Sequence, residues 1–107
     1  MRLQSLGTAM TTCTNTGTTV VAATKCPFLL GAMRFRHLGA VTAHDLVTIQ
    51  DGAGMLLDTF EVPYDATDTY LNYVWWVPPY PIRVTGGLIV TTTGANNVST
   101  LAFKAEE

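Results

Sequence analysis

Few side chains in this sequence are suited to acid–base or nucleophilic chemistry, namely His37, His44, Cys13, Cys26 and eight Asp and Glu residues. Neither histidine belongs to a recognisable catalytic motif. His44 precedes Asp45, but neighbours along a strand point to opposite faces, so this pair does not converge. No spacing supports a cysteine–histidine nucleophile. We therefore expect no catalytic residues and predict that the chain is not an enzyme.

Metal binding is the next chemistry to consider, because Asp58, Asp65 and Asp68 lie close together in the sequence. Carboxylates on a loop are the ligands that calcium prefers. The EF-hand spacing is absent, however, and aspartates favour turns because their side chains bond nearby backbone amides. The two cysteines lack the spacing of redox and zinc motifs, and we expect them to be reduced, packed thiols. The sequence predicts no metal and no cofactor, with a calcium site as the alternative.

Aromatic residues cluster between positions 64 and 80, at Tyr64, Tyr70, Tyr73, Trp75, Trp76 and Tyr80. They are consistent with core packing, with a protein contact surface, or with rings that stack on sugars as in carbohydrate-binding modules. In a strand, Tyr73 and Trp75 would share one face and Trp76 would lie on the other. We therefore expect at least one large ring to face away from the core.

The composition limits the class of protein and its partners. The chain has 107 residues, which is one ordinary domain, and 48% of them are hydrophobic, so disorder is not expected. Charged residues make up 13%, about half the usual share, which suggests that a partner covers part of the surface. The net charge of −2 argues against a nucleic-acid partner. There is no signal-peptide pattern and no apolar run of membrane-helix length, so we expect no membrane partner.

The elements that would position these side chains are β-strands. Threonine runs and alternating apolar residues favour extended backbone. Between residues 28 and 38, for example, Met33, Phe35 and His37 would share one face, and Arg34, Arg36 and Leu38 would share the other. Strands are predicted at residues 18–24, 28–38, 46–50, 55–60, 70–77, 82–85, 88–93 and 98–103.

Turn signals separate these strands. Asp51-Gly52-Ala53-Gly54 predicts a hairpin between residues 46–50 and 55–60, although Asp58 leaves the core face of the second arm undecided. Gly86-Gly87 indicates a bulge or a tight turn. Residues 94–97 predict a second hairpin, and the charged residues 104–107 predict a solvated tail.

Together these signals predict an all-β fold, an antiparallel β-sandwich or jelly roll of about seven or eight short strands. The sandwich would occupy residues 18–107 as a single domain. Residues 1–17, rich in Thr, Asn, Ser and Gly, predict an extended N-terminal arm.

From Arg34 onward the sequence contains the hairpin VTIQDGAGMLLDTFEVP and the segment PIRVTGGLIVTTTGANNVSTLAF. In these stretches it resembles small β-sandwich proteins of tailed-bacteriophage virions. A DGxG hairpin and a terminal GGLxVxTTG…V pair of strands recur in those proteins. The resemblance implies a role in building or coating a particle, with no catalytic residues to carry over.

The resulting expectation is a capsid decoration or cement protein, located in the virion and assembled in the host cytoplasm. It would associate with copies of itself, with a trimer favoured, and with the major capsid protein or another virion protein. The predicted interface combines the arm, which would lie along the capsid, with the aromatic strand: Arg2, Leu3, Leu6, Tyr73, Trp75, Trp76 and Tyr80. The alternatives are a tail, baseplate or fibre component that contacts the host surface, and a free carbohydrate- or calcium-binding β-sandwich module.

Overall fold

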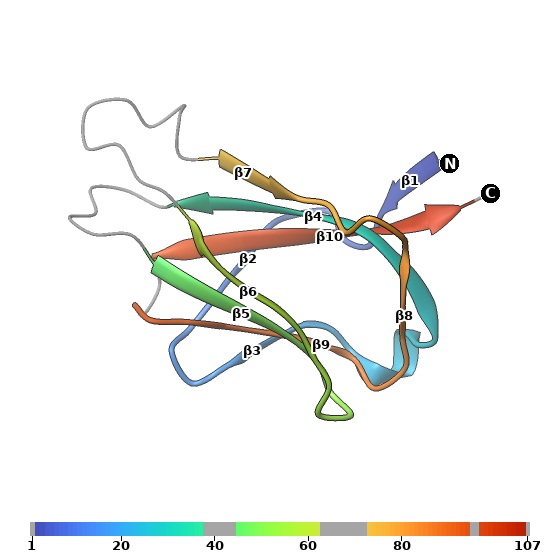
Figure 1. The fold of residues 1–107 in the computed structure, drawn as a ribbon, viewed down its shortest axis with the longest axis horizontal. Coiled ribbons are helices and arrows are strands. Elements are labelled where there is room, and N and C mark those ends of the chain that lie inside the picture. The colour runs from blue at the N-terminus through green and yellow to red at the C-terminus, as the bar shows by residue number, and fades with distance from the viewer. Residues whose placement is uncertain (1, 38–44, 63–72, 95–96, 107) are drawn as a thin grey trace.

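A computed structural model describes residues 2–37, 45–62, 73–94 and 97–106 of the chain. Its strands form two antiparallel sheets that pack face to face (Figure 1). The all-β sandwich prediction is therefore confirmed. In this described part, a 3₁₀ turn at Ala23–Lys25 interrupts the strands, and no helix is long and apolar enough to cross a membrane.

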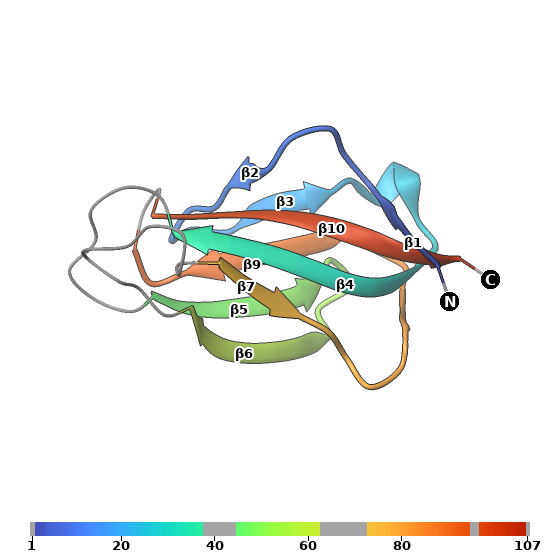
Figure 2. The same cartoon turned by 90° about the horizontal axis from the view of Figure 1, so that it is seen from above.

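The larger sheet, sheet A, has six strands: β1 (Arg2–Ser5), β2 (Thr11–Thr12), β4 (Phe28–His37), β7 (Tyr73–Trp76), β8 (Ile82–Val84) and β10 (Val98–Glu106). Its order is β1-β10-β4-β7, with β2 also on β10 and β8 also on β4. The smaller sheet, sheet B, has the order β3-β9-β5-β6: β3 (Thr18–Val21), β9 (Leu88–Thr92), β5 (Asp45–Asp51) and β6 (Leu56–Val62). Figure 2 looks onto sheet A, with β10 and β4 at its centre.

The core fills the space between the sheets and follows the alternation of β4. Met33, Phe35 and His37 are buried, whereas Arg34 and Arg36 are half-buried on the other face, as the sequence predicts. Leu38, expected on the face of the arginines, lies outside the described residues. The Phe35 ring meets Phe60 of β6 edge-on, with ring centroids 5.1 Å apart, and so joins the two sheets.

The predicted hairpin at Asp51–Gly54 is confirmed, since β5 and β6 pair antiparallel across it. Gly54 has a φ of 100°, which favours glycine. The structure also decides which face of β6 is inward. Asp58 pairs with Ile49 and Phe60 pairs with Val47, and both β5 partners are fully buried. Asp58 therefore lies on the core side of the strand.

Two predicted connections are wrong, because the flanking strands lie in different sheets. β8 pairs with β4, whereas β9 pairs with β5 and β3. Gly86-Gly87 is thus neither a bulge nor a tight turn between paired strands but a crossover from sheet A to sheet B. Residues 94–97 do not connect a hairpin either, since β10 belongs to sheet A. Glycine and asparagine mark a change of chain direction without specifying the strand that pairs next.

The extended arm predicted at residues 1–17 is not confirmed. β1 and β2 both pair with β10, and the Cys13 side chain is fully buried in the core. The Cys13 N–H donates to the Val98 carbonyl in sheet A, and the Thr14 carbonyl accepts from Thr92 in sheet B. The predicted solvated tail is also corrected, because residues 104–106 continue β10 and pair with β1.

Gly52 offers a test of the crossover, because the two glycine segments touch there. A Cβ atom on Gly52 would lie 2.0 Å from the Gly86 carbonyl oxygen, whereas one on Gly7 would meet its nearest atom at 3.5 Å. We expect Gly52→Ala to lower the free energy of unfolding by about 2 kcal/mol or more, measured by urea denaturation. Gly7→Ala, the control, should stay within about 0.5 kcal/mol. Equal stability of the two variants would contradict the close approach.

Candidate functional site

The outer face of sheet A collects apolar side chains and arginines from five strands. Residues that pair across antiparallel strands share a face. Trp75 pairs with Arg34 and Arg34 with Leu101, Ala32 pairs with Phe103, Leu29 with Arg83, and Leu3 with Ala105. We define the outer face of sheet A by these ten residues: Leu3, Leu29, Ala32, Arg34, Arg36, Trp75, Arg83, Leu101, Phe103 and Ala105.

Trp75 is the largest side chain on this face and is 53% exposed. Its ring lies 5.2 Å from the Phe103 ring, with the planes tilted by 38°. Because β4 runs between β7 and β10, the two rings meet above that strand. Ala32, the partner of Phe103 on β4, is fully buried. A small residue at this position thus leaves room for an aromatic pair.

Leu3 extends the same face along β1. Its side chain is 42% exposed and lies over Gly31, where a Cβ atom would come within 2.5 Å of the Leu3 Cδ2 atom. Gly31 is the extra residue where the register of β4 and β10 shifts. Arg2, which is exposed, pairs with Glu106 at 3.2 Å. Leu6, by contrast, packs against the core.

The two tryptophans face opposite ways, as the alternation predicts. Trp76 packs against the core, and its indole N–H donates to Asp58 Oδ2 at 2.7 Å. This hydrogen bond links β7 of sheet A to β6 of sheet B and satisfies the inward carboxylate that made the face of β6 ambiguous in the sequence. Tyr80, after β7, is 79% exposed. Tyr73 of β7 pairs with Arg36 of β4.

Six of the seven predicted interface residues divide into two sets, and the side chain of the seventh, Tyr73, lies outside the described part of the structure. Leu3 and Trp75 lie on the outer face of sheet A, and Arg2 and Tyr80 are exposed outside it. Leu6 and Trp76 are turned toward the core, and their packing contributes to stability. Sequence reasoning missed Leu29, Arg83 and Phe103, although inward-outward alternation along their strands would have placed them.

Replacing Trp76 tests the link between the sheets. Trp76→Phe keeps an aromatic ring but removes the donor to Asp58, so we expect a loss of about 1–3 kcal/mol in unfolding free energy by urea denaturation. Trp75→Phe is the matched control, since its ring faces outward and its loss should be near 0.5 kcal/mol. Asp58→Asn keeps an oxygen acceptor and should cost less than Trp76→Phe. If the two tryptophan variants were equally stable, the hydrogen bond would not join the sheets energetically.

Asp51, at the end of β5, is a buried carboxylate with many donors. Its Oδ1 accepts from the N–H groups of Ala53 and Gly86, each at 2.9 Å, and its Oδ2 from the N–H of Thr85 at 2.9 Å. Hydrogen bonds from the Ala53 and Thr85 backbones lower the pKa of the Asp51 carboxyl from its ordinary value of 3.8. The side chain therefore acts as a structural clamp between the hairpin and the β8–β9 crossover.

The lowered pKa of Asp51 predicts acid lability. A depressed pKa stabilises the fold above the unfolded-state value, and that contribution is lost as pH falls through the folded-state value. We expect the urea midpoint of the wild type to fall between about pH 5 and about pH 3. Asp51→Asn should be less stable by about 2 kcal/mol at neutral pH and should lose less on acidification. An equal loss on acidification in both proteins would contradict this role.

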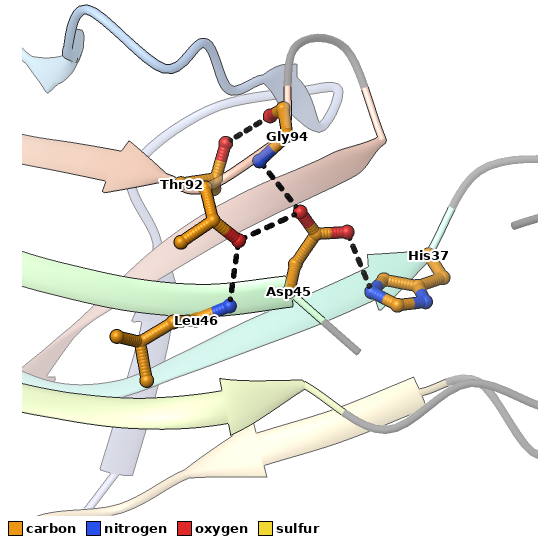
Figure 3. Close-up of polar contacts among 6 residues, drawn as sticks. His37, Asp45, Leu46, Thr92 and Gly94 are labelled. Carbon is orange, nitrogen blue, oxygen red and sulfur yellow. Dashed lines mark hydrogen bonds and ion pairs between the residues drawn. The ribbon is translucent and has the colours of Figure 1, made fainter. Parts of the chain in front are cut away.

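A second polar cluster closes the other end of β5 (Figure 3). Asp45 Oδ1 accepts from the Gly94 N–H at 2.8 Å and from the Thr93 hydroxyl at 3.3 Å, and Asp45 Oδ2 lies 3.2 Å from His37 Nε2. Leu46 N–H donates to the Thr93 hydroxyl at 3.1 Å. The cluster thus ties the end of β4 and the end of β9 to the start of β5.

The histidine–carboxylate contact combines two side chains of a catalytic triad, but the carboxylate lies near Nε2, the nitrogen that a triad histidine uses toward its nucleophile. His37 is 2% exposed and Asp45 is 3% exposed, so a substrate has no access to the ring. The sequence pairing of His44 with Asp45 missed this contact, and His44 lies outside the described residues. The sequence did contain a signal for the burial of Asp45. The alternating residues Asp45, Val47, Ile49 and Asp51 share one face of β5, and this series begins and ends with a carboxylate.

The remaining candidates for chemistry are structural where they are described. Both cysteines are free thiols; burial raises the pKa of Cys13 to about 12, and Cys26 Sγ accepts the Gly87 N–H at 3.2 Å. Across residues 2–37, 45–62, 73–94 and 97–106, no group of three His, Cys, Asp or Glu side chains is arranged to hold a metal ion. Asp65 and Asp68 of the alternative calcium site lie outside these ranges.

Comparison of the chain with models of known protein families, with curated proteins and with solved structures found no significant match.

Proposed function

We propose that the chain is a structural protein of a bacteriophage virion, a capsid decoration or cement protein. In this role the outer face of sheet A binds the shell formed by the major capsid protein, and further copies of the chain associate into a trimer. The proposal concerns binding and assembly rather than catalysis.

The observation that carries this proposal is an exposed tryptophan together with exposed leucines on the outer face of sheet A, whereas the exposed apolar residues of sheet B, Leu46, Met55 and Leu56, include no aromatic ring. Trp75, Leu3 and Leu29 are 53%, 42% and 43% exposed on the outer face of sheet A. Tryptophan is among the residues that contribute most to interface energies. Large exposed apolar areas mark interaction sites, and a chain with 13% charged residues has few charges to keep such a face in water.

The interior supports the same class of function. The described buried carboxylates Asp45 and Asp51 are used by backbone and threonine donors that join strands. These two carboxylates therefore serve the fold, and we look for the binding surface on the outside of the molecule. The hairpin and residues 81–103 resemble virion sandwich proteins, and this resemblance is the reason for proposing a virus particle as the partner.

Purified particles from cells that carry the gene test this proposal. The chain should co-purify with them in many copies, detected by mass spectrometry, and should rebind to particles stripped of it in a sedimentation assay. Trp75→Ala should weaken rebinding at least about tenfold, because it truncates the largest ring on the contact face. The free chain should be a trimer by light scattering.

Met55→Ala provides the matched control. Met55 is 61% exposed but lies beside the β5–β6 turn of sheet B. This variant should rebind as the wild type does. Absence of the chain from the particles, or equal loss of binding in both variants, would overturn the proposed contact. The N-terminal segment is tested by a truncation of residues 1–5. Removing the whole predicted arm, residues 1–17, would also remove the buried Cys13 from the core.

The exposure of Trp75 and Tyr80 favours one second candidate, a sugar-contacting role as a tail, baseplate or fibre component or as a free carbohydrate-binding module. Exposed rings are required for stacking on sugars. Glycan-dependent quenching of tryptophan fluorescence in the wild type would favour it if the quenching is lost in Trp75→Phe, in which only Trp76 emits. A glycan-insensitive spectrum together with particle binding would favour the decoration protein.

A further inference from the structure

The charges on the outer face of sheet A point to the chemistry of its partner. Arg34, Arg36 and Arg83 lie on this face among the apolar residues. Arg34 and Arg36 are half-buried and already make contacts of their own, whereas Arg83 is exposed. None of the ten residues that define the face is acidic. The face therefore combines aromatic and aliphatic contact area with positive charge.

Arg83 has a particular setting within this face. It lines a depression together with Pro27, Phe28 and Leu29, at the start of β4 where β8 pairs with it. A guanidinium beside an apolar depression fits a carboxylate that is flanked by an apolar side chain, because the carboxylate accepts from the guanidinium while the apolar group fills the depression.

We propose that the outer face of sheet A docks on an acidic protein surface, with Arg83 receiving a carboxylate at the edge of the apolar depression. This inference rests on the proposed function and names the chemistry of the shell surface that the face would meet. Positive and negative surfaces in register also orient the partners and speed their encounter.

Among the residues that the structure describes, the acidic side chains of a second copy are already engaged: Glu106 of β10, for example, is paired with Arg2 and Lys104. In sheet B, Asp45 and Asp51 are buried and bonded internally, and Asp58 is bonded to Trp76. Glu61 is exposed but has an interaction of its own. The occupant inferred here is therefore a different protein, and self-association would use another surface.

The experiment uses the full chain and two fluorescent peptides, one of repeating Glu-Glu-Leu units and one of repeating Lys-Lys-Leu units. Fluorescence anisotropy should show saturable binding of the acidic peptide and none of the basic one, with affinity that falls as NaCl increases. Arg83→Glu should weaken binding of the acidic peptide at least about tenfold, and Arg83→Lys should retain part of it.

Lys25→Glu is the matched control, since Lys25 is an exposed cation in the 3₁₀ turn and the substitution changes the net charge equally. It should bind the acidic peptide within about twofold of the wild type. Equal effects of the two reversals, equal binding of both peptides, or tighter binding of oligo(dT) than of the acidic peptide would overturn the proposal. The last result would indicate single-stranded nucleic acid as the ligand.

Both charge-reversal variants also enter the particle-rebinding assay, which separates the two proposals. Loss of rebinding in Arg83→Glu with retention in Lys25→Glu supports both. Rebinding that is insensitive to Arg83→Glu rejects the acidic contact and leaves the decoration role standing. Arg83-dependent peptide binding without any particle binding rejects the decoration role and leaves the acidic ligand standing.

Discussion

The hydrogen bonds to the Asp51 carboxylate are the interaction on which the arrangement of the two sheets depends. One carboxylate accepts from Ala53 in the β5–β6 hairpin and from Thr85 and Gly86 in the crossover between β8 and β9. It therefore fixes the place where the chain leaves sheet A and enters sheet B. Gly52 and Gly86 allow the two backbones to approach more closely than any side chain would permit. Since β9 lies between β3 and β5, the position of this crossover determines how the centre of sheet B forms.

The same strand carries a second buried carboxylate at its other end. Asp45 and Asp51 flank the buried Val47 and Ile49. The two carboxylates therefore lie at the ends of the inward series, within reach of backbone N–H donors from neighbouring segments. A buried polar group costs free energy unless it is hydrogen-bonded. Both carboxylates are hydrogen-bonded, Asp51 to the N–H of Gly86 and Asp45 to the N–H of Gly94. The hydrogen-bonding capacity of these carboxylates is used to join strands.

Because these interior carboxylates are hydrogen-bonded within the fold, we assign the proposed contact to the outer face of sheet A. Trp75 and Trp76 are adjacent in the sequence, yet one ring lies on this face over Ala32 while the other bonds Asp58 inside. The inward ring holds β7 in place, and its hydrogen bond thereby positions the outward ring. Stability and surface chemistry are thus coupled through two neighbouring residues of a four-residue strand.

The sequence by itself determined the all-β class, the inward alternation of β4, the Asp51–Gly54 hairpin and the opposite orientation of the two tryptophans, because these depend on local backbone preference and the two-residue period of a strand. The tertiary structure decided the rest. Pairing partners are non-local, so the glycines at 86–87 and the residues 94–97 specified turns without revealing that each crosses between sheets. Likewise, only packing showed that residues 2–5 add a strand beside β10 and that Asp58 finds its donor in Trp76, since both contacts join positions far apart in the chain.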